Sequence, residues 1–424
     1  MSANPQAREP LWDIVEESLD EAEFLWSRWE SDLGSLTRNL DEVFVWSEER
    51  LHGALDGVRV GGAGAVDKLL VPALADENLR RVTVAAHLMA SGMGPQALNV
   101  LGENLLTATG ARLAALLRGV ETAALDGSFV AVANKLAQSG PASCAALCQL
   151  KSFQRAAVGV ELATAFQADD PAHLGRAMHA ARFAGNEAAR FVEAGMANKN
   201  AAVAVSAIES GLRLQLPAAW AAVRERARAP AVADAGLLRF AAALGGAEEF
   251  RAIIDAAAQE PLRVAALHAL GHVGTVEAVE ACLAHLADPK AARAAGEAYC
   301  AITGAELERD RLALAEPATD SPEFADDDLD ANLVPPPHAL WPLPDAAAVR
   351  AHWDAKKARF EPGVRYLSGQ PRNSQSLMQA VATAPMLRRP DWVFELNARS
   401  QRKYDVEPRA FRATQRRQLQ AAVS

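Results

Sequence analysis

The stretch EPLRVAALHALGHVGTVEAVEACLAHLADPKAARAAGEAYCAITG, residues 260–304, decides the fold. Its first helix is predicted to begin at Glu260 and Pro261, because an acidic side chain suits a helix start and proline suits the first turn. The same acidic-proline start returns at Pro289, 28 residues after Pro261. The pattern therefore predicts a repeated unit of two helices.

Small and apolar residues recur at three- and four-residue spacing along this first helix, which predicts one buried face; they are Leu262, Ala265, Ala266, Ala269 and Leu270. Gly271 and Gly274 are expected to end the helix, and Gly304 follows Gly274 by 30 residues. This length is typical of a short HEAT-type unit. One unit cannot bury its apolar face alone, so we expect roughly seven or eight stacked units between 62 and 310.

Composition agrees with a helical array. Half of the 424 residues are hydrophobic, whereas only 6% are aromatic and alanine dominates, which favours helix over sheet. The predicted fold is all-α: a HEAT-like α-solenoid with an N-terminal helical pair and a C-terminal, partly irregular helical segment. The expected divisions are an acidic helix pair (1–61), the repeats (62–310), an acidic proline-rich linker or strap (311–344) and a basic helical segment (345–424).

Charge and hydropathy restrict the partners. The formal net charge is −10, and residues 81–345 hold 21 bases against 30 acids, a balance of 21 − 30 = −9. This argues against a nucleic-acid partner, which would need a basic surface. The N-terminus lacks the basic and apolar regions of a signal peptide, and no segment is apolar and long enough for a membrane span. We therefore expect a cytoplasmic protein.

No catalytic motif, cofactor site or metal site is predicted. The glycine-rich VGGAGAVDK at 60–68 lacks the spacing of a phosphate-binding loop and is interpreted as a flexible connection. Cys144 and Cys148 lie one helical turn apart without further ligands at metal spacing, which favours buried small side chains. His268 and His272 are also one turn apart, but packing or surface roles are the default for them.

Tryptophans are concentrated near the N-terminus. Four of the eight, Trp12, Trp26, Trp29 and Trp46, lie in the first 46 residues and are candidate partner-binding residues. The alternative is that they cement the helix pair onto the first repeat. The first 80 residues hold 17 acids and 7 bases, a balance of 7 − 17 = −10. This end could therefore be a solvated face or could attract a basic partner.

The C-terminal part has the opposite charge. Residues 346–424 contain 15 bases and 6 acids, a balance of 15 − 6 = +9. We expect this segment to pair with an acidic surface, in the same chain or in another, or to dock by burying Trp353, Phe360, Tyr366 and Trp392. Within its predicted turn PGVRYLSGQP, Arg365 and Tyr366 are further candidate partner-binding residues. The sequence does not predict the oligomeric state.

Several segments together resemble one bacterial family. They are the N-terminal EAEFLWSRW, the helix and loop LDEVFVWSEERLHGALDGVRVGG, the degenerate middle repeats and the C-terminal AHWDAKKARFEPGVRYLSGQP. The chain is similar over nearly its whole length to an uncharacterised, mostly proteobacterial HEAT-repeat family whose genes often lie beside type VI secretion genes. Individual repeats also resemble the short HEAT-like units of phycobilin lyases.

Two functional hypotheses follow. The acidic solenoid and the family resemblance favour a non-enzymatic protein-binding scaffold, an accessory, adaptor or immunity protein of a type VI secretion system whose partner is a secretion component or an effector. The alternative is a lyase-like or nucleic-acid-processing enzyme on a HEAT scaffold, against which the acidic repeat region counts.

Overall fold

In the computed structural model of this protein, the described residues are 10–123, 127–185, 188–315 and 341–421. Over these ranges the chain is an all-α, HEAT-like solenoid, which confirms the predicted fold class. The only strands in the described ranges, β1 (Tyr366–Leu367) and β2 (Gln370–Pro371), pair as a short antiparallel hairpin. Among the helices described, none combines the length and the apolar character needed to cross a membrane.

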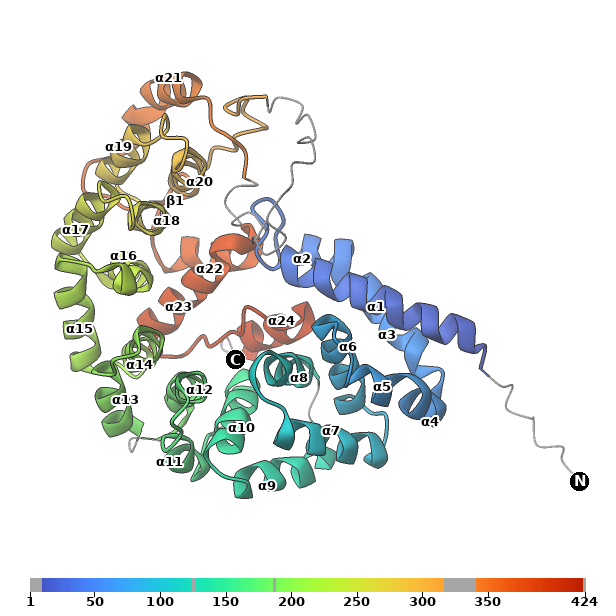
Figure 1. Cartoon of the computed structure of the whole chain (residues 1–424). Coiled ribbons are helices and arrows are strands. Elements are labelled where there is room, and N and C mark those ends of the chain that lie inside the picture. Colours follow the sequence, from blue (N-terminus) through green and yellow to red (C-terminus); the bar gives the residue numbers. More distant parts are fainter. Residues whose placement is uncertain (1–9, 124–126, 186–187, 316–340, 422–424) are drawn as a thin grey trace, which may run out of the picture. The chain divides into compact units, whose positions relative to one another are not determined.

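The chain divides into two compact units, coloured along the sequence in Figure 1. Unit 1 contains residues 1–219 and 382–424, and unit 2 contains residues 220–381. The basic segment expected at 345–424 is therefore not one body, because its first part belongs to unit 2 and its last part to unit 1. The boundaries fall within α15 (Pro217–Arg228) and near the end of α22 (Ser374–Thr383).

The helices of unit 1 begin with the N-terminal pair and continue as repeats, and two further helices come from the C-terminal segment. They are α1 (Trp12–Asp32), α2 (Leu40–Val43), α3 (Glu49–Arg59), α4 (Gly62–Ala65), α5 (Val71–Ala73), α6 (Leu79–Ala90), α7 (Pro95–Thr107), α8 (Gly110–Thr122), α9 (Val130–Gln138), α10 (Pro141–Phe153), α11 (Glu161–Ala165), α12 (Pro171–Ala180), α13 (Ala188–Met196), α14 (Ala201–Arg213), α23 (Arg389–Arg399) and α24 (Arg412–Ala421).

Unit 2 contains the last repeats and the hairpin. Its helices are most of α15, α16 (Leu238–Leu244), α17 (Ala247–Ala257), α18 (Arg263–Val273), α19 (Val276–Ala284), α20 (Ala292–Thr303), α21 (Ala346–Lys356) and most of α22. Short 3₁₀ turns are η3 (Gly127–Phe129), η4 (Ala181–Phe183) and η8 (Met386–Arg388) in unit 1, and η5 (Val232–Leu237) and η7 (Lys357–Arg359) in unit 2.

The repeats are helix pairs. In the described part of the chain they run from α6/α7 to α18/α19, followed by the single helix α20, close to the predicted seven or eight units. In unit 1 the even-numbered helices α6 to α14 form the inner row in Figure 1, and α7, α9, α11 and α13 lie outside them. Taken together, the buried side chains of these inner helices are mostly alanine, leucine and valine, and the small ones among them allow neighbouring helices to approach closely.

Two glycines mark the period in unit 2. Gly274 and Gly304 end α18 and α20 in the left-handed conformation, with φ of 73° and 74°. The expected stop at Gly271 is wrong, since this residue lies inside α18. The helix also begins later than predicted: Pro261 lies in a turn, and α18 starts at Arg263.

The N-terminal helix pair is interrupted by a wider turn. Between α2 and α3 the chain forms a π-helical turn, η1 (Phe44–Glu48), and a second one, η2 (Val66–Leu70), follows α4. The buried positions Val43, Ser47, Leu51 and Leu55 recur at steps of four, which would drift around a regular α-helix. The wider turn keeps them on one face, against α1.

The last part of the chain runs back along the inner helices of unit 1. An arginine near the C-terminal end of each of four successive inner helices contacts it. The contacts are Arg118 Nη2 to the Arg409 carbonyl (2.9 Å), Arg155 Nη1 to Glu407 Oε2 (2.8 Å), the Arg182 carbonyl to Arg402 Nη2 (2.6 Å), and the Arg213 guanidinium over the Phe394 ring (5.2 Å).

Glu407 is central to this contact in unit 1. Its burial would raise the pKa of the carboxyl, but the positive charges of Arg155 and Arg182 outweigh burial and hold the pKa of Glu407 at about 2. The segment from 389 to 421 is therefore held in its own chain, by charge pairs and by burial together. Trp392, one of the residues predicted to dock it, is only 3% exposed.

The two ends of the predicted linker lie side by side in unit 2. Leu314 N donates to the Leu343 carbonyl at 2.8 Å, and Asp345 N donates to the Leu312 carbonyl at 2.7 Å. The acidic, proline-rich residues between these ends, 316–340, lie outside the described residues.

Candidate functional site

Two of the candidate tryptophans form the core of the N-terminal helix pair. Trp26 and Trp29 are 2% and 0% exposed, and their rings meet edge to face at 5.5 Å. The Phe411 ring lies 4.5 Å from that of Trp29, and Trp29 Nε1 donates to Glu48 at 3.2 Å. These side chains pack inside unit 1, as the alternative interpretation expected, and they are not accessible to a partner in this structure.

Trp12 is half-buried against the glycine-rich stretch. A Cβ at Gly64 would lie 2.6 Å from the Trp12 ring, so the absence of a side chain there gives the ring its place. The Lys68 ammonium lies 3.9 Å from the centre of the same ring. The stretch expected to be a flexible connection is therefore helical, forming α4 and η2, and packs Trp12.

Trp46 is the candidate tryptophan that faces solvent. It is 56% exposed, and its neighbour Val45 is 62% exposed, both on the outer side of η1. The Arg38 guanidinium stacks on the Trp46 ring at 4.9 Å. The exposed carboxylates of Glu42 and Glu49 flank the pair in sequence. This surface, Val45 with Trp46, combines exposed apolar area with acidic surroundings.

Arg365 and Tyr366 are engaged within unit 2. The Arg365 side chain donates to the carbonyls of Ala242 and His272 at 2.7 Å and of Val273 at 2.9 Å. It thereby caps the C-terminal ends of α16 and α18, where unpaired carbonyls and the helix dipole favour a cation. Tyr366 is 4% exposed and donates its N–H to the Gly274 carbonyl at 2.7 Å. Both positions hold the hairpin on the repeats.

The hairpin turn also caps α20. Ser368 and Gly369, between the two strands, have φ of 49° and 76°, the left-handed pair typical of a tight two-residue hairpin turn. Their N–H groups donate to the carbonyls of Ala301 and Ile302 at 2.8 Å. A Cβ at Gly304 would lie 2.6 Å from the Ser368 carbonyl oxygen, so this approach requires glycine.

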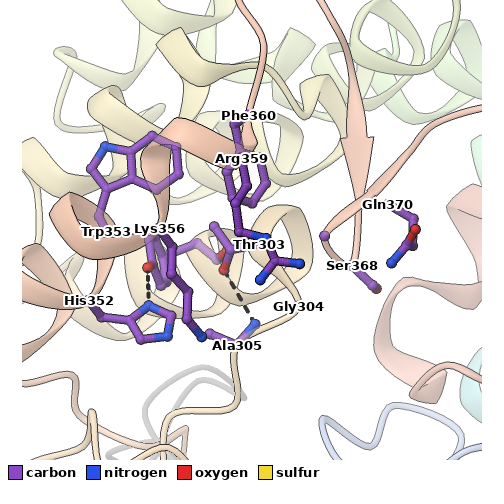
Figure 2. A pocket seen from close by; sticks show the side chains of 12 residues that line it. Thr303, Gly304, Ala305, His352, Trp353, Lys356, Arg359, Phe360, Ser368 and Gln370 are labelled. Atoms are coloured by element: carbon purple, nitrogen blue, oxygen red, sulfur yellow. Dashed lines mark hydrogen bonds between the residues drawn. The ribbon is translucent and has the colours of Figure 1, made fainter.

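A pocket of about 210 Å³ opens beside this turn in unit 2, shown in Figure 2. The end of α20, helix α21 with η7, and the hairpin turn form its walls. Its lining residues are Tyr299, Thr303, Gly304, Ala305, His352, Trp353, Lys356, Arg359, Phe360, Ser368, Gly369 and Gln370. These walls are fixed by contacts of α21, since Trp353 Nε1 donates to Glu280 at 2.7 Å and Arg350 Nη2 donates to the Leu283 carbonyl at 2.7 Å.

A tyrosine–histidine pair lies at one side of the pocket. Tyr299 Oη and His352 Nδ1 are 2.6 Å apart. Burial raises the pKa of Tyr299, so the phenol keeps its proton and donates it to Nδ1. Burial, followed by the nearby charge of Lys356, lowers the pKa of His352, so the ring is neutral and carries its proton on Nε2.

The basic side chains of the pocket are Lys356 and Arg359, and both are exposed. Figure 2 shows Arg359 reaching between Thr303 and Ser368, with His352 and Lys356 on the other side. The sequence analysis missed this group. The spacing of His352 and Lys356, one helical turn apart in AHWDAKKARF, was a usable signal. Nothing local to Tyr299 indicated a partner 53 residues away.

The other residues singled out in the sequence have structural positions. Cys144 and Cys148 are buried on α10, and burial raises the pKa of both thiols. His268 and His272 lie on α18 with ring centres 5.2 Å apart, and His272 is buried.

The architecture described above is that of an α-solenoid. No protein-family model and no curated protein matches the sequence. Among solved structures, human deoxyhypusine hydroxylase in complex with glycerol matches with 17% identity and a TM-score of 0.19. The match covers 66% of this chain and 97% of that chain. A match at this TM-score carries no conclusion about activity or ligands.

Proposed function

We propose that this chain is a non-enzymatic protein-binding scaffold, and that the surface formed by Val45 and Trp46 contacts the partner. The supporting observation is the exposure of these two adjacent apolar side chains on a helix pair in which Trp26 and Trp29 are buried and Trp12 is half-buried. Exposed aromatic side chains surrounded by polar residues are frequent anchors of protein interfaces. Stacked repeats also offer the extended surface that a large partner needs.

The proposed partner presents a basic face. The first 80 residues carry 17 acids and 7 bases, and Glu42 and Glu49 are exposed on either side of the apolar pair. A basic surface would gain from this charge during encounter, and the apolar contact would supply the affinity. Following the family resemblance, we propose a secretion component or effector as this partner, with an accessory, adaptor or immunity role in the cytoplasm.

Affinity purification from the source cell tests the proposal. The tagged full chain, Trp46→Ala and Val160→Ala would be compared, because Val160 is 89% exposed elsewhere in unit 1 and serves as the matched surface control. We expect a stoichiometric partner with wild type and Val160→Ala and a loss of at least about tenfold with Trp46→Ala. Equal thermal midpoints would exclude unfolding as the cause.

Two outcomes would contradict the scaffold proposal. Recovery of the same partner with Trp46→Ala would remove Trp46 from the interface. Turnover of a small substrate by the pure protein, with no stoichiometric partner in any purification, would favour the enzymatic alternative instead.

A further inference from the structure

The pocket of unit 2 carries positive charge that its own walls do not neutralise. Lys356 and Arg359 line it, and the lining contains no acidic residue. Neither side chain has a hydrogen-bond or ion-pair partner in the described part of the chain. Asp310, which is not among the lining residues, interacts electrostatically with Lys356. Its carboxylate already accepts the Glu306 N–H at 2.9 Å and pairs with Arg309 at 3.4 Å.

His352 adds a donor without an acceptor. Its Nδ1 is occupied by the Tyr299 hydroxyl, whereas its Nε2 is shielded from solvent and has no hydrogen-bond partner. A buried N–H without a partner costs free energy, which an acceptor at the pocket would recover. Lys356 is the i+4 neighbour of His352 on α21, and its long exposed side chain can move to admit that acceptor.

The remaining polar groups suit an oxyanion. The hydroxyl of Ser368 and the amide of Gln370 also line the pocket, and Figure 2 shows both across from His352. Two cations match the two charges of a phosphate monoester, whereas a monocarboxylate would leave one cation uncompensated. Lysine and arginine beside neutral N–H and O–H donors are the usual composition of phosphate sites.

We propose that this pocket of unit 2 binds the phosphate group of a phosphomonoester. Its volume of about 210 Å³ accommodates a phosphate and only a few further atoms. The ligand is therefore a small phosphorylated molecule, free phosphate, or the phosphorylated side chain of a protein. The inference is independent of the protein-binding surface on unit 1.

Isothermal titration of the full chain at constant ionic strength provides the test. The probes are O-phosphoserine, inorganic phosphate and a short phosphoserine peptide, with serine and acetate as controls. We expect a dissociation constant of about 1 mM or tighter for at least one phosphate probe and no binding of serine or acetate. Tighter binding of the peptide would indicate a protein side chain, and equal binding of all phosphate probes would indicate the phosphate group alone.

Variants locate the binding. Lys356→Gln and Arg359→Gln should each weaken it by about tenfold. The control is Lys357→Gln, which removes the same charge one residue away, where the ammonium pairs with Asp354 at 3.1 Å outside the pocket. Absence of phosphate binding, or equal weakening by Lys357→Gln and Lys356→Gln, would overturn the proposal, since the latter would reflect only general attraction.

Discussion

Gly274 must be glycine for two separate reasons. Its φ of 73° is one that other residues adopt at a cost, and a Cβ there would lie 2.3 Å from the Tyr366 carbonyl oxygen. Gly363 shares the first property, with φ of 78°, but has no atom within 4 Å of such a Cβ. Substitutions at the two positions therefore distinguish the cost of backbone strain from the cost of a steric clash.

We predict that Gly363→Ala costs about 1–2 kcal/mol of unfolding free energy, the price of a left-handed alanine. Gly274→Ala should cost clearly more, because the hairpin must also move away from α18. Urea unfolding of both variants measures the difference. Equal losses would show that the hairpin is not seated on Gly274.

A buried histidine, His87, and a half-buried one, His179, make unit 1 sensitive to acid. Burial, reinforced by Arg59, lowers the pKa of His87 to about 3, and burial with Arg182 lowers the pKa of His179 to about 3. In the unfolded chain each imidazole takes up a proton near pH 6.5. Between about pH 3 and 6.5 the unfolded state therefore binds more protons, and stability rises with pH through this window.

At pH 5 each histidine should reduce the unfolding free energy by roughly 2 kcal/mol relative to pH 8. His87→Gln and His179→Gln should each remove about that much of the difference between pH 5 and pH 8, even where they lower stability at both values. Urea unfolding at the two pH values measures it. A pH dependence unchanged in both variants would contradict the assignment.

At the scale of elements, the stripe residue Ala266 is fully buried on α18, which packs against α16 and α20. We predict that Ala266→Trp overpacks this contact and costs about 1–3 kcal/mol. Ala284→Trp, at the exposed end of α19, is the matched control and should cost little. Thermal unfolding compares the two, and an unchanged midpoint for Ala266→Trp would place that residue outside the stack.

The sequence predicted the elements whose information is local. The recurrence of Gly274 and Gly304 predicted the period, because both positions need the left-handed conformation that glycine adopts freely. Trp26 and Trp29 were candidate partner-binding residues, and their burial agrees with the alternative that they hold the helix pair on the first repeat. The first turn of α18 was misplaced, since a proline suits the preceding turn as well as the helix start.

The remaining features depend on distant partners. Arg365 looked like an exposed cation because the carbonyls of Ala242 and His272 that it caps lie about a hundred residues earlier. The His352 pocket likewise needs Tyr299 from another helix. Local periodicity carries no information about such contacts, so the candidate pocket became visible only from the fold.

At the scale of the molecule, charge and apolar burial both hold the C-terminal segment in unit 1, and their magnitudes differ. Arg416 pairs with Asp41 at 2.5 Å, but the two side chains are 47% and 48% exposed. Exposed pairs of this kind contribute up to about 1 kcal/mol. Phe411 is 7% exposed among Trp26, Trp29 and His87, and truncating such a side chain costs about 3–5 kcal/mol.

We therefore predict that Phe411→Ala loosens α24 at any salt concentration, whereas Arg416→Ala has a small effect that disappears at high salt. Hydrogen exchange of α24 in the full chain, at low and high salt, measures both, with Arg417→Ala as the control. Salt screens exposed charges, with a screening length of roughly 10 Å at 0.1 M, so the stabilisation from charge pairing should fall at high salt and the stabilisation from apolar burial should not. A strong loss of protection in wild type at high salt would instead make charge pairing the dominant attachment, and the basic character of this segment would then decide its docking.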